Sequence, residues 1–157
     1  MPRIFAENLD GSGLRVAIAV SRFRSLITER MLAGALEALA EHGVDDESIT
    51  IAWVPGSFEL SYAARRFAET GKYDTVICIG CVIKGETDHN EYINNQAARG
   101  IAEISEQTGV PAIFGVITPN NFEQAIARAG EGTANKGYEA AVTGIVMANL
   151  RRRLEEA

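Results

Sequence analysis

Short apolar runs alternate along the chain with longer segments in which apolar residues recur every three or four positions. The runs span residues 14–23, 49–54, 74–83 and 112–118. Runs of this length are typical of buried strands, and the segments between them have the spacing of amphipathic helices. Because the two patterns alternate, we expect an α/β protein, a three-layer α/β/α sandwich with a four-stranded parallel sheet.

Glycine and asparagine mark where the predicted helices begin and end. Gly43 and Gly71 follow the first two helical segments, and Asn121 precedes a later one. The loop 130–137 then separates that helix from a final one near the C-terminus. The first dozen or so residues have no apolar pattern of their own. We therefore expect a single domain over residues 1–157 in which residues 1–13 form an N-terminal arm.

Composition and charge exclude several classes of protein. The 157 residues are 46% hydrophobic, enough to bury one sizeable core, which argues against a disordered chain. The formal net charge of -6 gives no overall footprint for nucleic acid, and the arginines at 151–153 fit a solvated helix end. The N-terminus lacks the apolar core of a signal peptide, and no window is long enough to span a membrane. We expect a cytoplasmic protein that binds neither membranes nor nucleic acid.

The only two cysteines, Cys78 and Cys81, have the C-x-x-C spacing of thiol redox motifs. A redox pair normally opens a helix, whereas these residues lie inside an apolar, β-branched run. Within a strand their Cα atoms are about 10 Å apart and their side chains point to opposite faces, beyond the roughly 7 Å limit for a disulfide. We therefore expect two buried structural thiols.

Chemistry is expected where the strands end, because open parallel sheets bind ligands outside the carboxyl ends of their strands. The segments concerned are 21–24, 54–59 and 82–89, and we expect them to converge in space. Within the third, Gly85-Glu86-Thr87 could bind a small phosphate through backbone N–H groups, or Thr87 could simply cap a helix. The lysine in this run precedes the second glycine, so the segment is not a P-loop.

Three further side chains in these segments suit binding or catalysis, and each has a structural alternative. Phe23 could stack on a planar heterocycle or pack in the core. Glu59 could bind the hydroxyls of a polyol or favour a helix N-terminus. His89 could transfer protons near neutral pH or simply be exposed, whereas His42 fits a helix end. No second His or Cys stands at ligand spacing, so we expect no metal site.

Five segments then carry a resemblance to a known family: VPGSFEL, GCVIKGETDHNEYINN, PAIFGVIT, FEQAIARAG and NKGYEAA. In this order, from Ser21 to Leu150, the chain resembles the 6,7-dimethyl-8-ribityllumazine synthases. The resemblance implies a flavodoxin-like fold and a transferase of riboflavin biosynthesis that acts at the penultimate step without a cofactor. Such an enzyme condenses 5-amino-6-(D-ribitylamino)uracil with 3,4-dihydroxy-2-butanone 4-phosphate and releases 6,7-dimethyl-8-ribityllumazine, phosphate and water.

The resemblance also implies roles for individual residues. His89 falls on the proton-transfer residue of the family. The butanone phosphate is expected to contact Glu86, Thr87 and Arg128. The ribitylaminouracil is expected to contact a larger set, namely Phe23, Ser57, Phe58, Glu59, Cys81, Val82, Ile83, Phe114 and Lys136.

Phe114 and Arg128 lie away from the strand ends where the other residues gather. The family places its site between neighbouring subunits of a pentameric ring, so the resemblance implies a homo-oligomer in which these two residues complete the pocket of the next chain. Family members form pentamers, decamers and shells of sixty chains. The short loop 130–137 resembles that of the shell-forming members, which favours an icosahedral capsid of twelve pentamers, with riboflavin synthase as a further partner.

Two interpretations from other classes stay open at this point. A flavodoxin-like module could hold a flavin at the same edge without converting it, and a shell protein could assemble without activity. The chain also departs from common versions of the family pattern at Arg24, Ser61 and Asn90, where Asn, Pro and an aromatic residue are frequent. We expect none of the three to be an acid, a base or a phosphate ligand, so the departures affect pocket detail more than the reaction.

Overall fold

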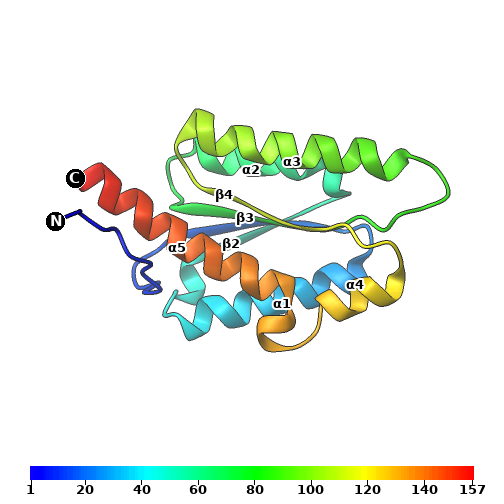
Figure 1. Cartoon of the computed structure of the whole chain (residues 1–157), viewed down its shortest axis with the longest axis horizontal. Helices are drawn as coiled ribbons and strands as arrows, with labels where there is room; N and C mark the ends of the chain where they lie inside the picture. Colours follow the sequence, from blue (N-terminus) through cyan, green and yellow to red (C-terminus); the bar gives the residue numbers. More distant parts are fainter.

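The computed structural model describes residues 1–157 and contains one sheet of four parallel strands. The strand order is β2-β1-β3-β4, with bounds Ile49–Val54, Val16–Ser21, Thr75–Cys81 and Ala112–Ile117 in that order. All three strand pairs are parallel. Helices cover both faces of the sheet (Figure 1), so the predicted three-layer, flavodoxin-like α/β/α sandwich is confirmed.

The five helices divide between the two faces of the sheet, two on one and three on the other, and Figure 1 shows both layers. The first face carries α2, Leu60–Glu69, and α3, His89–Thr108. The second carries α1, Ser25–Glu41, α4, Phe122–Arg128, and α5, Lys136–Glu156. No helix has both the length and the apolar character that a membrane crossing needs.

The two faces of the central strand β1 differ in side-chain size. Val16 and Ile18 point into the core shared with α1 and α5, whereas Ala17 and Ala19 point into the core shared with α2 and α3. Every residue of β1 is buried, as expected for a central strand of a parallel sheet covered on both sides. The larger side chains of β1 therefore face the helices α1 and α5, and the smaller ones face α2 and α3.

The element ends differ slightly from the sequence prediction. The second helical segment starts with a 3₁₀ turn over Ser57–Glu59 and becomes α-helical only at Leu60. The sequence predicts the first strand over residues 14–23, but the strand pairs as a ladder only over Val16–Ser21. Two more backbone bonds follow, because the Arg22 N–H donates to the Val54 carbonyl at 2.7 Å and the Phe23 N–H donates to the Pro55 carbonyl at 2.9 Å. These bonds hold the segments after β1 and β2 side by side.

The start of α5 is fixed against α1 by the buried side chain of Asn135. Its Nδ2 donates to the carbonyl oxygens of Arg30 and Gly130, at 3.0 and 2.8 Å, while its Oδ1 accepts from the Gly137 N–H at 2.8 Å. Gly137 meets α1 so closely that a side chain there has no room. The loop before α5, and Lys136 at its first turn, are thereby held in place.

The N-terminal arm is tied to α5 by polar contacts. The Asn149 side chain donates to two backbone carbonyls of the arm, and the Arg153 guanidinium lies 5.2 Å from the ring centroid of Phe5. Arg152 pairs with Asp74 at 3.3 Å. Arg152 and Arg153, at the end of α5, therefore contact other segments of the chain. The sequence predicts only a solvated helix end for them.

Candidate active site

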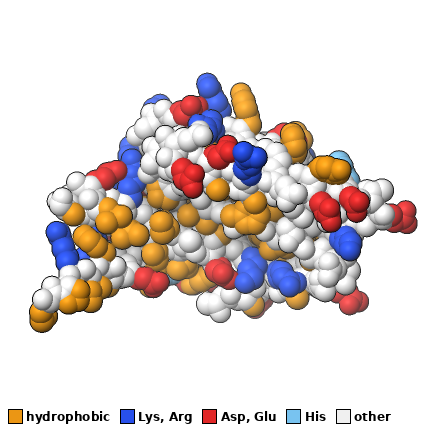
Figure 2. All heavy atoms as spheres, turned by 45° about the horizontal axis from the view of Figure 1, so that its top comes forward, with side chains coloured by type: hydrophobic (Ala, Val, Ile, Leu, Met, Phe, Trp, Pro, Cys, Tyr) orange, Lys and Arg blue, Asp and Glu red, His pale blue; other side chains and the backbone are white.

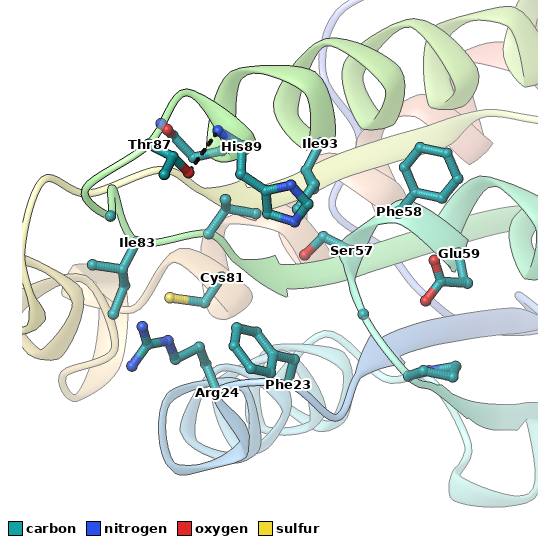
Figure 3. Close-up of a pocket in the computed structure, with 15 residues that line it drawn as sticks. Phe23, Arg24, Ser57, Phe58, Glu59, Cys81, Ile83, Thr87, His89 and Ile93 are labelled. Atoms are coloured by element: carbon teal, nitrogen blue, oxygen red, sulfur yellow. Dashed lines mark hydrogen bonds between the residues drawn. The ribbon is translucent and has the colours of Figure 1, made fainter.

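A cavity of about 620 Å³ opens beyond the carboxyl ends of β1, β2 and β3 (Figure 3). The three segments that follow these strands and the first turn of α3 line it, so the expected convergence of the strand ends is what the structure shows. The residues implied by the family resemblance that line this cavity are Phe23, Ser57, Phe58, Glu59, Cys81, Val82, Ile83, Thr87 and His89.

The ring of Phe23 borders the cavity and does not pack in the core. Phe23 is 65% exposed, so the alternative interpretation as a core side chain is wrong. The Phe23 N–H donates to the Pro55 carbonyl at 2.9 Å, which fixes the backbone beneath the ring. An exposed aromatic face at the mouth of a cavity suits stacking on a flat heterocycle.

Ser57 is buried and forms part of the cavity wall where the wall meets the sheet. A Cβ built on Gly80 of β3 would lie 2.5 Å from the Ser57 Oγ, so only a glycine leaves room for this hydroxyl. The Ser21 Oγ lies near the same point and is buried without a hydrogen-bond partner. The Ser57 hydroxyl therefore gives the floor of the cavity a polar group, and the buried Ser21 hydroxyl lies behind it.

Glu59 is the only carboxylate that lines the cavity. It immediately precedes α2, but its side chain makes no capping hydrogen bond. It forms no ion pair either. Glu59 thus stands at a helix start, as the alternative interpretation has it, but makes no capping hydrogen bond, and the carboxylate is free to accept hydrogen bonds from hydroxyl groups of a ligand.

The turn between β3 and α3 brings Thr87 and His89 to the other end of the cavity. The Thr87 Oγ1 accepts a hydrogen bond from the His89 N–H at 3.3 Å, which closes a local turn just before α3, whereas the N-cap residue itself is Asp88 and makes no capping side-chain bond. His89 is exposed, and Figure 3 shows its imidazole ring pointing into the cavity. Glu86 is exposed and does not line the cavity. No cluster of His, Cys, Asp or Glu is arranged to hold a metal ion.

His42 and the two cysteines have structural surroundings, as predicted. His42 Nδ1 lies 2.7 Å from the Ala38 carbonyl at the end of α1. Cys78 and Cys81 are free, buried and on opposite faces of β3. Burial raises the pKa of the Cys78 thiol to about 12 and that of Cys81 to about 11, where the charge of Arg24 opposes the effect of burial. Both thiols are protonated near neutral pH, which rules out a reactive redox pair.

Three residues implied by the resemblance lie on other parts of the surface. Phe114, on the edge strand β4, is 44% exposed and borders a separate hollow together with Lys136. Arg128, at the end of α4, and Lys136 border a further hollow. The Arg128 guanidinium donates to the Gln124 carbonyl of its own helix at 3.2 Å and forms no ion pair. A single chain thus presents these groups outward, away from the main cavity.

The cavity also contains side chains that the sequence did not single out as functional. Arg24 and Asn90 line it, although the sequence shows them only as departures from a common pattern. Ile93 lines it as well and stands one helical turn after His89, so the spacing of four residues on α3 is a signal that could have found it.

One comparison with known proteins bears on this arrangement. The model of the family described as 6,7-dimethyl-8-ribityllumazine synthase matches residues 13–152, which include all four strands and nearly all of α5. The matched range contains every residue for which the sequence resemblance implies a role. The chain therefore belongs to the 6,7-dimethyl-8-ribityllumazine synthase family.

Proposed function

We propose that the cavity at the strand ends is where this transferase joins its two small-molecule substrates. Family membership gives the reaction, the formation of 6,7-dimethyl-8-ribityllumazine in riboflavin biosynthesis. The assignment of that reaction to particular residues is the proposal. The observation that carries it is the convergence on one cavity of an exposed aromatic ring, a free carboxylate and an exposed histidine, namely Phe23, Glu59 and His89.

The ribitylaminouracil binds along the part of the cavity formed after β1 and β2. Phe23 stacks on the pyrimidine ring, because its exposed face stands at the cavity mouth. Glu59 accepts hydrogen bonds from the ribityl hydroxyls, and Ser57 offers a hydroxyl at the floor. The backbone of 81–83, with Phe58, completes the binding surface for this substrate.

The butanone phosphate binds at the turn before α3. Backbone N–H groups at a helix start favour an anion, and α3 is a long helix whose first turn borders the cavity. Glu86 and Thr87 contribute the turn that carries these groups. Arg128 of a neighbouring chain, whose guanidinium has no ion-pair partner in its own chain, binds the same phosphate through two parallel N–H···O hydrogen bonds.

The chemistry requires proton transfers, and His89 is the residue placed to perform them. The 5-amino nitrogen of the uracil attacks the ketone carbon, and loss of water gives an imine. Phosphate then leaves by elimination, and the ribitylamino nitrogen closes the ring with loss of a second water. Each step moves a proton to or from a reacting group near the His89 imidazole. Holding the two reactants in register supplies a further part of the acceleration.

Family membership also implies an assembly of like chains, and we propose that it is at least a pentamer with active sites between subunits. Phe114, Lys136 and Arg128 point away from the cavity of their own chain, which this arrangement explains. Figure 2 shows apolar side chains gathered in a band across one face of the molecule. Exposed apolar residues of β4 and α5 include Phe114, Met147 and Leu154.

Four finer expectations stay part of the proposal: two rest on the resemblance, and the location and the single domain rest on the composition and pattern of the sequence. The short loop 130–137 favours a capsid of twelve pentamers. Riboflavin synthase is the further partner that such a capsid suggests, and the cytoplasm is the expected location. The whole chain, with the arm of residues 1–13, is proposed to act as one domain.

The proposed reaction predicts that the purified protein, mixed with both substrates, forms lumazine and releases one phosphate for each lumazine. Lumazine absorbance and a phosphate assay follow the two products, and mixtures that lack one substrate or the protein are the controls. A binding module would take up the ribitylaminouracil without turnover, and a shell protein would assemble without turnover. Either result would contradict the proposal.

A further inference from the structure

The charges that line the main cavity are separated along its length. Arg24 is the only Lys or Arg side chain on the wall, and Glu59 is the only carboxylate. Figure 3 shows Glu59 beside Phe58 at one end, while Arg24 extends toward Ile83 at the end where the turn before α3 lies. One end of the cavity thus favours hydroxyl groups and the other end favours an anion.

The guanidinium of Arg24 has no charged partner within the chain. It forms no ion pair. Its Cζ lies over the ring of Phe23, 5.3 Å from the centroid, so the guanidinium contacts the proposed stacking residue. Its neighbour Arg22 makes the same kind of contact with Trp53 at 5.4 Å, but Arg22 lies outside the cavity. A guanidinium that is charged, unpaired and beside a cavity is suited to bind an anionic ligand.

The backbone at Arg24 is held in a conformation that arginine rarely adopts. Its φ of 63° makes it the only non-glycine residue with positive φ in the chain. The Arg24 carbonyl accepts hydrogen bonds from the Ile27 and Thr28 N–H groups, at 2.9 and 3.1 Å, so the start of α1 locks this geometry. Strained backbone of this kind persists where the surroundings determine it, and it is found most often at ligand sites.

We propose that Arg24 binds the phosphate group of the butanone substrate from within the chain. This inference rests on the proposed function, and it departs from the expectation that Arg24 is no phosphate ligand. Arg24 and Thr87 lie on either side of Ile83 at the same end of the cavity (Figure 3). The guanidinium thereby faces the phosphate from the side of β1, while the turn before α3 faces it from the other side. A phosphate monoester is the ligand class that both groups recognise.

Two variants at this position test the inference. Arg24→Gln removes the charge, and Arg24→Asn removes it with a residue that accepts positive φ more readily. We expect both variants to raise the Michaelis constant for the butanone phosphate about tenfold, because a charge-assisted hydrogen bond is lost. The inhibition constant of inorganic phosphate rises by a similar factor. The Michaelis constant for the ribitylaminouracil changes less than that for the butanone phosphate, because the uracil substrate carries no phosphate. Arg22→Gln, the matched control outside the cavity, leaves all three constants unchanged.

Thermal melting separates binding from folding in the same variants. Arg24→Asn is expected to melt at or above the temperature of the parent, because asparagine relieves the backbone strain. Equal changes in both Michaelis constants would overturn the inference, and so would a change for the uracil alone, since Arg24 would then act through Phe23. If the parent forms no lumazine, the proposed function fails. Calorimetry with inorganic phosphate, comparing the parent with Arg24→Asn, then still decides whether Arg24 binds phosphate.

Discussion

Arg128→Ala is expected to raise the Michaelis constant for the butanone phosphate about a hundredfold, while the constant for the ribitylaminouracil changes little. A guanidinium that binds phosphate as a fork contributes about 3 kcal/mol through charge-assisted hydrogen bonds, and about 1.4 kcal/mol corresponds to a factor of ten. The uracil substrate carries no phosphate, so it loses none of this energy. Arg128 makes no ion pair in its own chain that the substitution would break.

Steady-state kinetics with each substrate varied in turn measures this difference. Arg99→Ala is the matched control, because Arg99 is an exposed arginine that pairs only with Glu103 on the same helix. We expect the control to keep both Michaelis constants. Equal increases for the two substrates in Arg128→Ala would mean that Arg128 supports the fold or the interface, and the phosphate assignment would then be wrong.

His89→Ala is expected to lower kcat about tenfold to a hundredfold and to leave the melting temperature unchanged. General acid–base catalysis typically contributes about a hundredfold or more, but water can replace part of it and the two substrates stay in register. The side chain is exposed, so little packing is lost. The bond between the His89 N–H and Thr87 involves only the His89 backbone and survives the substitution.

Turnover rates and thermal melts of the parent and the variant decide the role of His89. His42→Ala removes the other histidine, which is bonded at the end of α1, and is expected to keep full turnover. An unchanged kcat in His89→Ala would remove this residue from the mechanism. A marked fall in its melting temperature would show instead that the side chain serves packing.

The fold was predictable because the apolar runs, the helical spacing between them and the residues at the helix ends all indicate the same architecture. Alternating strands and helices imply a parallel sheet, and such a sheet brings its strand ends to one edge. That rule, applied to the sequence, is sufficient to place Phe23, Glu59 and His89 near one another. The exact element ends were less certain, since the 3₁₀ turn at Ser57–Glu59 has the same residue types as a helix start.

The finer properties of the site depend on tertiary contacts that no local pattern contains. The surroundings of each side chain in the folded chain determine whether Phe23 packs in the core or stays exposed for stacking on a ligand. They also determine whether Glu59 caps α2. The unusual backbone of Arg24 also comes from its place between β1 and α1, because arginine itself does not favour positive φ. The proposed placement of Phe114 and Arg128 in an active site requires a second chain, which one sequence describes only through its resemblance to a family.

The central claim, an active site built from two chains, is tested most directly by mixing two impaired variants. His89→Ala and Arg128→Ala subunits are unfolded together in equal amounts and refolded, and light scattering verifies that the mixture is a pentamer or larger. In mixed rings about a quarter of the sites then combine an intact His89 with an intact Arg128 from the neighbouring chain. At a butanone phosphate concentration well below the parent Michaelis constant, where Arg128→Ala is also slow, we predict lumazine formation at about a quarter of the parent rate, well above either variant refolded alone. A mixture no more active than the average of the two variants, or a monomer with full activity, would contradict the shared site.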